Sequence, residues 1–156
     1  MNREQIYAVL MALEGDTLLL PNAAVAEVIS RDTLQPAEDG APPWMIGYCD
    51  WNNRRVPVVS FETINGAPRP GAESRRSRIV VLNSFGTHLP AGLLAVLSQG
   101  YPHLVTLNRA AVKTMGLRPT DRGDLVLSRV RIASQEAAIP DLATIEAEIS
   151  RLQSVA

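Results

Sequence analysis

The sequence predicts a mainly β protein, built as a sandwich or as small barrels, that ends in an amphipathic helix. Short apolar runs recur at a spacing of roughly 8–12 residues, with clusters of glycine, proline and asparagine between them. Only the end of the chain changes to helical spacing, with Leu142, Ile145, Ile149 and Leu152 on one side. A chain of 156 residues with 46% apolar residues also has enough apolar content to bury a core.

The first part of the chain predicts a hairpin, a short helical turn and a loop. Glu14-Gly15-Asp16 is a good turn between two apolar runs, and Asn22 is expected to cap a short helical turn. Proline and glycine then mark a loop before residue 44. In chain order, the expected strands are residues 6–13 and 17–20, the helical turn is followed by the segment at residues 25–29, and the expected loop is residues 32–43.

The centre of the chain predicts a second hairpin. Residues 44–51 and 56–61 are β-prone apolar runs on either side of a polar corner, Asn52-Asn53-Arg54. Asparagine tolerates the left-handed backbone conformation that a tight corner requires. Pro57 has no N–H to donate, so that edge of the second strand is expected to be unpaired or bulged.

Two tryptophans belong to this hairpin. Trp44 and Trp51 are an odd number of residues apart, so they are expected on opposite faces of the strand. One belongs to the core, and the other is either a second core residue or a contact-surface aromatic.

The second half predicts more strands and then the helix. The loop at residues 65–77 is expected to divide a single domain, residues 1–156, into two β-rich subdomains. Asn108 is expected to cap a helical turn that ends at Gly116, and the alternating Arg129 and Arg131 indicate a solvent-exposed strand face. Further expected features are strands at 78–83, 92–97, 103–107 and 125–133, a turn at 84–87, a helical turn at 109–115, and outward-facing Glu146 and Glu148 on the final helix.

Charge and reactive residues argue against several function classes. The net charge of −1 disfavours a general polyanion partner, although a small nucleic-acid-binding barrel remains the alternative hypothesis. No nucleophile–base pair, phosphate-binding loop or metal-ligand spacing is present, so we expect neither an enzyme nor a cofactor, metal or small-molecule ligand. Cys49 is expected to be a buried, unreactive thiol. Asp39, Asp50 and Glu62 are expected to be solvated carboxylates. The arginines at positions 69, 75, 76 and 78 are expected to lie on a surface loop.

The expected location is the cytoplasm. A single cysteine fits a reducing compartment, and neither a signal peptide nor an apolar run of membrane-spanning length is present. Direct insertion into a membrane is therefore not expected.

The central segment, PPWMIGYCDWNNRRVPVVSF at residues 42–61, resembles the signature of the CheW-like family, the coupling adaptors of bacterial chemosensory arrays. The family glycine corresponds to Gly47, and its Val-Pro-Val corresponds to residues 56–58. The resemblance covers most of the chain, strongly to Phe61 and more weakly after Gly86. Additional matching stretches are residues 25–29, 79–81, 92–96 and the pair Asp141-Leu142.

This resemblance implies two SH3-like five-stranded barrels around a shared core, with no catalytic machinery. Such proteins bridge the regulatory domain of a histidine kinase and the cytoplasmic tip of a chemoreceptor. By resemblance, Glu27 and Val28 lie on a kinase-facing or ring-forming surface, and Asn52 and Asn53 lie near the receptor-facing groove. The residues expected to line that groove are Val25, Val56 and Val58.

The chain departs from the family pattern at the hairpin corner. The family Arg-Gly is Asn52-Asn53 here, and Ser60 replaces the usual aspartate. Asn52 is shorter than arginine and uncharged, whereas Asn53 can keep the conformation of a glycine. We therefore expect the fold to be retained and the recognition to change, as in a divergent or accessory adaptor of a system that controls, for example, surface pili.

Overall fold

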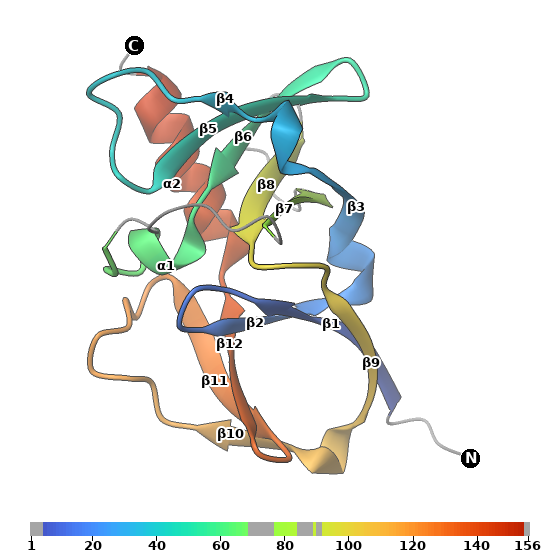
Figure 1. Ribbon diagram of the computed structural model, residues 1–156. Helices are drawn as coiled ribbons and strands as arrows, with labels where there is room; N and C mark the ends of the chain where they lie inside the picture. Colours follow the sequence, from blue (N-terminus) through green and yellow to red (C-terminus); the bar gives the residue numbers. More distant parts are fainter. Residues whose placement is uncertain (1–4, 69–76, 84–88, 90–91, 155–156) are drawn as a thin grey trace.

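The computed structural model describes residues 5–68, 77–83, 89 and 92–154 of the chain. The described strands form two curled six-stranded sheets that pack together, with a helix from the C-terminal region against them (Figure 1). The predicted fold class is confirmed, although each sheet has six described strands instead of five. In one sheet the additional strand is the two-residue β4 (Gln35–Pro36).

One sheet, here called the terminal sheet, combines the two ends of the chain. Its strand order is β10-β11-β12-β2-β1-β9. Its neighbouring strands are antiparallel except for β12 and β2, which run parallel. The strands are β1 (Gln5–Ala12), β2 (Thr17–Pro21), β9 (His103–Asn108), β10 (Val112–Met115), β11 (Val126–Ile132) and β12 (Gln135–Pro140).

The other sheet, here called the central sheet, is formed by one continuous stretch between β2 and β9. Its order is β3-β7-β8-β6-β5-β4. The strands on both sides of residues 65–77, β6 and β7, belong to this sheet, so the predicted subdomain boundary at that loop is wrong. Besides β4, its strands are β3 (Val25–Ser30), β5 (Met45–Trp51), β6 (Arg54–Val59), β7 (Arg78–Asn83) and β8 (Leu93–Ser98).

Short helical elements join the strands. The helices are α1 (Phe61–Ile64), α2 (Leu142–Ser154) and the 3-10 turns η1 (Asn22–Ala24), η2 (Arg31–Thr33) and η3 (Arg109–Ala111). The predicted C-terminal helix is confirmed, and its Ile145 and Ile149 are fully buried. Glu146 is also buried, so its predicted outward position is wrong.

Two predicted caps have different outcomes. Asn22 lies inside η1, whose N-cap position is Pro21, so the predicted Asn22 cap is wrong. Asn108 does cap η3, because its side chain accepts a hydrogen bond from the backbone N–H of Ala110 at 3.0 Å. The turn ends at Ala111 and not at Gly116, and the residues that follow form β10.

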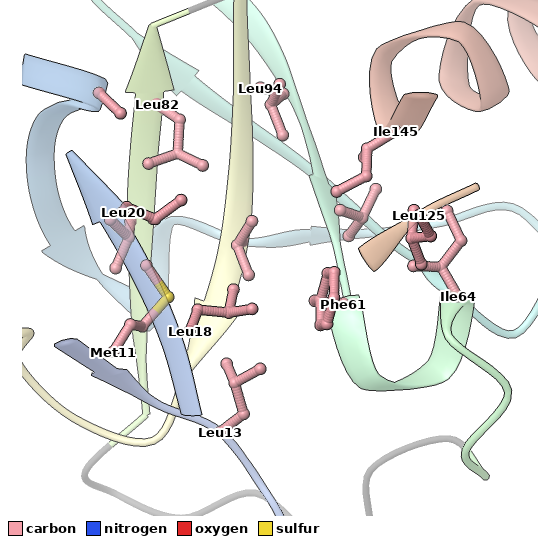
Figure 2. Packing of buried hydrophobic residues seen from close by; sticks show 14 of the residues in the cluster. Met11, Leu13, Leu18, Leu20, Phe61, Ile64, Leu82, Leu94, Leu125 and Ile145 are labelled. Atoms are coloured by element: carbon pink, nitrogen blue, oxygen red, sulfur yellow. The ribbon is translucent and has the colours of Figure 1, made fainter. Parts of the chain in front are cut away.

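Apolar side chains form three cores. The shared core lies between the sheets and α2, and Figure 2 shows part of it, including Met11, Phe61 and Ile145. A second core is enclosed by the central sheet and a third by the terminal sheet. This arrangement is the one expected for two small barrels that share a core. The buried members of the third core are Ala8, Leu10, Leu19, Leu107, Val130 and Ala137.

The β5–β6 hairpin has the predicted corner. Trp51 pairs with Arg54, and Asn52 and Asn53 between them have φ values of 53° and 62°. Two consecutive residues with positive φ make the tight turn that matches the twist of a hairpin. Pairing of β6 with β8 begins at Val58, directly after Pro57, so the predicted unpaired edge is confirmed.

Gly47 permits a close crossing of two backbones. A Cβ atom at this position would overlap the backbone carbonyl of Gln35 in β4. Any side chain at residue 47 would therefore displace β4 from β5. This steric overlap explains why a glycine is required at the position of the family glycine.

A buried arginine joins distant segments of the terminal sheet. Arg129 of β11 is 1% exposed, and its Nη1 and Nη2 donate to the two carboxylate oxygens of Asp16 at 2.8 and 2.9 Å. Its Nε and Nη2 donate to the two oxygens of Asp121 at 2.8 and 2.7 Å. The prediction that Arg129 lies on a solvent-exposed face is therefore wrong. Its buried guanidinium is hydrogen-bonded to two carboxylates in place of water.

Asn65 and Arg122 extend these contacts to the helices. The Asn65 side chain donates to Asp121 at 3.0 Å and accepts from the backbone N–H of Arg122 at 2.8 Å. The Arg122 guanidinium donates to Glu148 of α2 at 2.8 Å. We call Asp16, Asn65, Asp121, Arg122 and Arg129 the junction network. Its hydrogen bonds, those from Arg129 above all, hold the pKa of Asp121 far below its ordinary value.

Candidate protein-interaction site

Glu27 and the hairpin corner meet at one surface. The indole Nε1 of Trp51 donates to Oε2 of Glu27 at 2.8 Å. Glu27 lies on β3 and Trp51 ends β5, and these strands lie near opposite ends of the central sheet order. The sheet therefore curls far enough to bring its two sides together, and this places two sets of predicted site residues side by side.

The corner itself is exposed. Glu27, Asn52 and Asn53 are exposed, and Trp51 is half-buried. We call these four residues the corner patch. It contains one carboxylate, two amides and an aromatic ring, a combination suited to polar contacts around an aromatic anchor. Trp51 packs against the core of the central sheet and Trp44 against the shared core, so the prediction of opposite faces is confirmed.

The predicted apolar groove residues have different environments. Val25 and Val28 are half-buried and pack at the margin of the shared core. Val56 and Val58 are fully buried in the core of the central sheet, so the prediction that they line an open groove is wrong. Their run of β-branched residues has no polar alternation, which is typical of a strand covered on both faces.

Cys49 has the predicted character of a structural thiol. It is fully buried, and burial together with the nearby Asp50 raises its pKa to about 11. A thiol with that pKa is almost entirely protonated at neutral pH and is a poor nucleophile. Asp39 and Asp50 are exposed as predicted, and Asp50 accepts a hydrogen bond from the Gln35 side chain at 3.0 Å.

Glu62 differs from the prediction of a solvated carboxylate. Its side chain is buried on α1 with 7% relative exposure. This burial could not be predicted, because Glu62 lies in a four-residue helix that is too short for apolar spacing to reveal. The predicted loop arginines at 69, 75 and 76 lie outside the described residues.

A cavity of about 640 Å³ lies beside the start of the hairpin. On its rim the guanidinium carbon of Arg55 is 3.9 Å from the centre of the Tyr48 ring. Its remaining wall is mainly apolar and comes from the loop after β4, the hairpin, β8 and the end of α2. Lining residues include Met45, Pro57, Leu93 and Leu152.

Metal-binding clusters and membrane-spanning helices are both absent from the described residues. No cluster of three or more His, Cys, Asp or Glu side chains in that part of the chain could hold a metal ion. Nor is any helix there long and apolar enough to cross a membrane.

Comparisons with known proteins identify the family. The model of the CheW-like domain matches residues 8–121, which include the whole central sheet and the corner patch. Among solved structures, the crystal structure of the scaffolding protein TtCheW from Thermoanaerobacter tengcongensis is similar, with a TM-score of 0.71 and 15% sequence identity. That match covers 88% of this chain and 84% of the other. No significant match was found among curated proteins. The family model spans most of the chain, and the chain therefore belongs to the CheW-like domain family.

Proposed function

We propose that this protein is a non-enzymatic adaptor of a bacterial chemosensory pathway that couples a chemoreceptor to a histidine kinase. Membership of the CheW-like family and the structural similarity to a CheW scaffolding protein support this proposal. Two weak contacts on one adaptor hold receptor and kinase at high effective concentration. The adaptor then acts in the cytoplasm, at arrays of membrane-bound receptors.

The observation that carries the proposal is the corner patch. The hydrogen bond between Trp51 and Glu27 fixes an exposed carboxylate beside the exposed Asn52 and Asn53. A side chain held in one rotamer loses less entropy on binding than a free one. The patch is thus a preorganised contact surface for a protein partner.

The patch also explains how this adaptor differs from the family pattern. Asn52 stands where the family has an arginine, so the corner carries the negative charge of Glu27 beside a neutral amide. We infer that its partner presents a donor or a positive charge to Glu27. The altered corner suits an accessory system, such as one that controls pilus-based motility, in place of the main swimming pathway.

The experiment combines three purified components from the organism of origin: this chain, a chemoreceptor tip and a kinase regulatory domain. A pull-down with the chain as bait selects the receptor and the kinase. We expect each component to bind the chain alone and all three to sediment as one ternary complex. If receptor and kinase exclude each other on the chain, the coupling function is contradicted.

Single substitutions then locate the contact. Glu27→Arg should weaken one of the two partners about tenfold and leave the other unchanged, because reversing a charge at an interface opposes binding. Asn52→Arg should change the affinity for the same partner. Lys113→Glu is the matched control, because Lys113 is exposed on β10 in the terminal sheet. Unchanged affinities for both partners in both corner variants would contradict the role of the patch.

A further inference from the structure

Glu62 is a buried acid at the place where α1 meets the terminal sheet. Phe61 and Ile64 of α1 enter the shared core together with Leu13 from the β1–β2 turn (Figure 2). Between them in sequence, the carboxyl group of Glu62 is enclosed with 7% relative exposure. A carboxylate in such a place is stable only if it is paired or protonated.

The described surroundings do not pair this carboxyl group. Its Oε1 accepts a hydrogen bond from the Ser60 hydroxyl at 3.3 Å, and its Oε2 is buried without a partner among the described residues. Ser60 is shared with the helix cap, since its hydroxyl also accepts from the backbone N–H of Thr63 at 3.3 Å. One long hydrogen bond does not replace the hydration of an ionised carboxylate.

Among the described residues, the charged groups that act on Glu62 are negative as well. They are Glu14 and Asp16, both in the β1–β2 turn. In the junction network, the guanidinium of Arg129 donates to Asp16 and Asp121, and that of Arg122 donates to Glu148. Burial is the main cause that raises the pKa of Glu62 to about 7. Hydrogen bonds from its own backbone N–H and from Ser60 oppose this shift, and the two carboxylates of the turn add to it.

We propose that Glu62 makes the junction between α1 and the β1–β2 turn sensitive to protons. With the carboxyl group protonated the junction is closed, and ionisation favours a local opening in which the group reaches water. The device lies apart from the corner patch and does not depend on which partner binds there.

The first test is a carbon NMR titration of the Glu62 side-chain carboxyl in the intact protein. The expected midpoint is near pH 7, and a midpoint near the ordinary value of 4.5 overturns the proposal. This measurement needs no variant, so it does not depend on how a substitution affects folding.

The second test is amide hydrogen exchange at residues 13–17 and 60–67, corrected for the intrinsic effect of pH. For the unmodified chain, the opening equilibrium should rise on the order of tenfold between pH 5.5 and pH 8. Glu62→Gln keeps the size of the side chain and removes the titration, so its opening should be independent of pH. Glu38→Gln, in an exposed loop, is the matched control and should behave like the unmodified chain. The same pH dependence in Glu62→Gln overturns the proposal.

Discussion

The β5–β6 hairpin and the junction network hold the molecule together in different ways. The hairpin consists of neighbours in sequence, with a turn of two asparagines and buried valines. The junction network consists of polar residues from widely separated parts of the chain, with Asp16 and Arg129 at its centre. Local sequence specifies the first region, whereas only the completed fold creates the second.

This difference predicts how each region fails. Replacing one residue of the hairpin removes the conformational preference of that residue only. The remaining residues of the two strands still favour the hairpin. Replacing one charge of the junction network leaves its partners buried and unpaired. We therefore expect the larger losses of stability at the junction.

The largest effect is expected for Arg129→Met. It leaves the carboxylates of Asp16 and Asp121 without their main partner, and breaking a buried pair typically destabilises a protein by about 3–5 kcal/mol. Urea denaturation measures the change in the free energy of unfolding. Arg131→Met is the control, since Arg131 is 51% exposed and its ion pair with Glu136 contributes below about 1 kcal/mol. Equal losses in the two variants would show that burial does not distinguish the two pairs.

The second largest effect is expected when acid weakens the junction network. The pKa of Asp121 is lowered in the folded protein, so its contribution is present above the unfolded pKa, about 3.8, and is lost as pH falls below it. We expect a loss of about 2 kcal/mol from this group as the pH is lowered from 5 toward 2. Thermal unfolding across that range measures it. Asp121→Asn should show a smaller dependence on acid, and an unchanged dependence would refute the assignment.

Gly47→Ala tests the hairpin against the strand that crosses it. The new methyl group overlaps the Gln35 carbonyl, so β4 must move, with an expected loss of about 1–2 kcal/mol. Gly123→Ala serves as the control, because a Cβ atom there has no neighbour within 4 Å. Chemical denaturation compares the two, and equal stabilities would mean that β4 shifts freely.

The smallest effect is expected at the turn. Asn53→Ala places alanine at a φ of 62° and should lower stability by about 1 kcal/mol. Asn53→Gly fits the same conformation and should be close to neutral. Unfolding midpoints of the pair separate backbone strain from the loss of the amide side chain. If both variants lose the same stability, the side chain and not the backbone is responsible.

The sequence alone allowed the hairpin, most strands and the final helix to be predicted, because these depend on near neighbours. Asn52 and Asn53 fixed the turn, and the helical spacing of Ile145 and Ile149 fixed the buried side of α2. β12 was missed because QEAAIP has neither β-branched enrichment nor clear alternation.

The polar interior could not be predicted in this way. Arg129 alternates with apolar residues as a surface residue does. No neighbouring residue in the sequence indicates its contact with Asp16. Burial of Val56 and Val58 depends on the curl of the central sheet, which encloses their side chains in its own core. At the candidate site, Glu27 and the two asparagines were predicted from the sequence. The hydrogen bond of Trp51 to Glu27 was not predicted, because it depends on the curl of the sheet.

The nesting of the central sheet between the two parts of the terminal sheet has a consequence for assembly. Gln5 of β1 pairs with Asn108 of β9, so the whole central sheet lies in the chain between these partners. Closing so long a loop is entropically unfavourable, and a folded insert shortens the effective loop. During synthesis on a ribosome, the central sheet can be complete before β9 has been made. We expect the central sheet to form first and to bring β1 and β9 close enough to pair in the correct register.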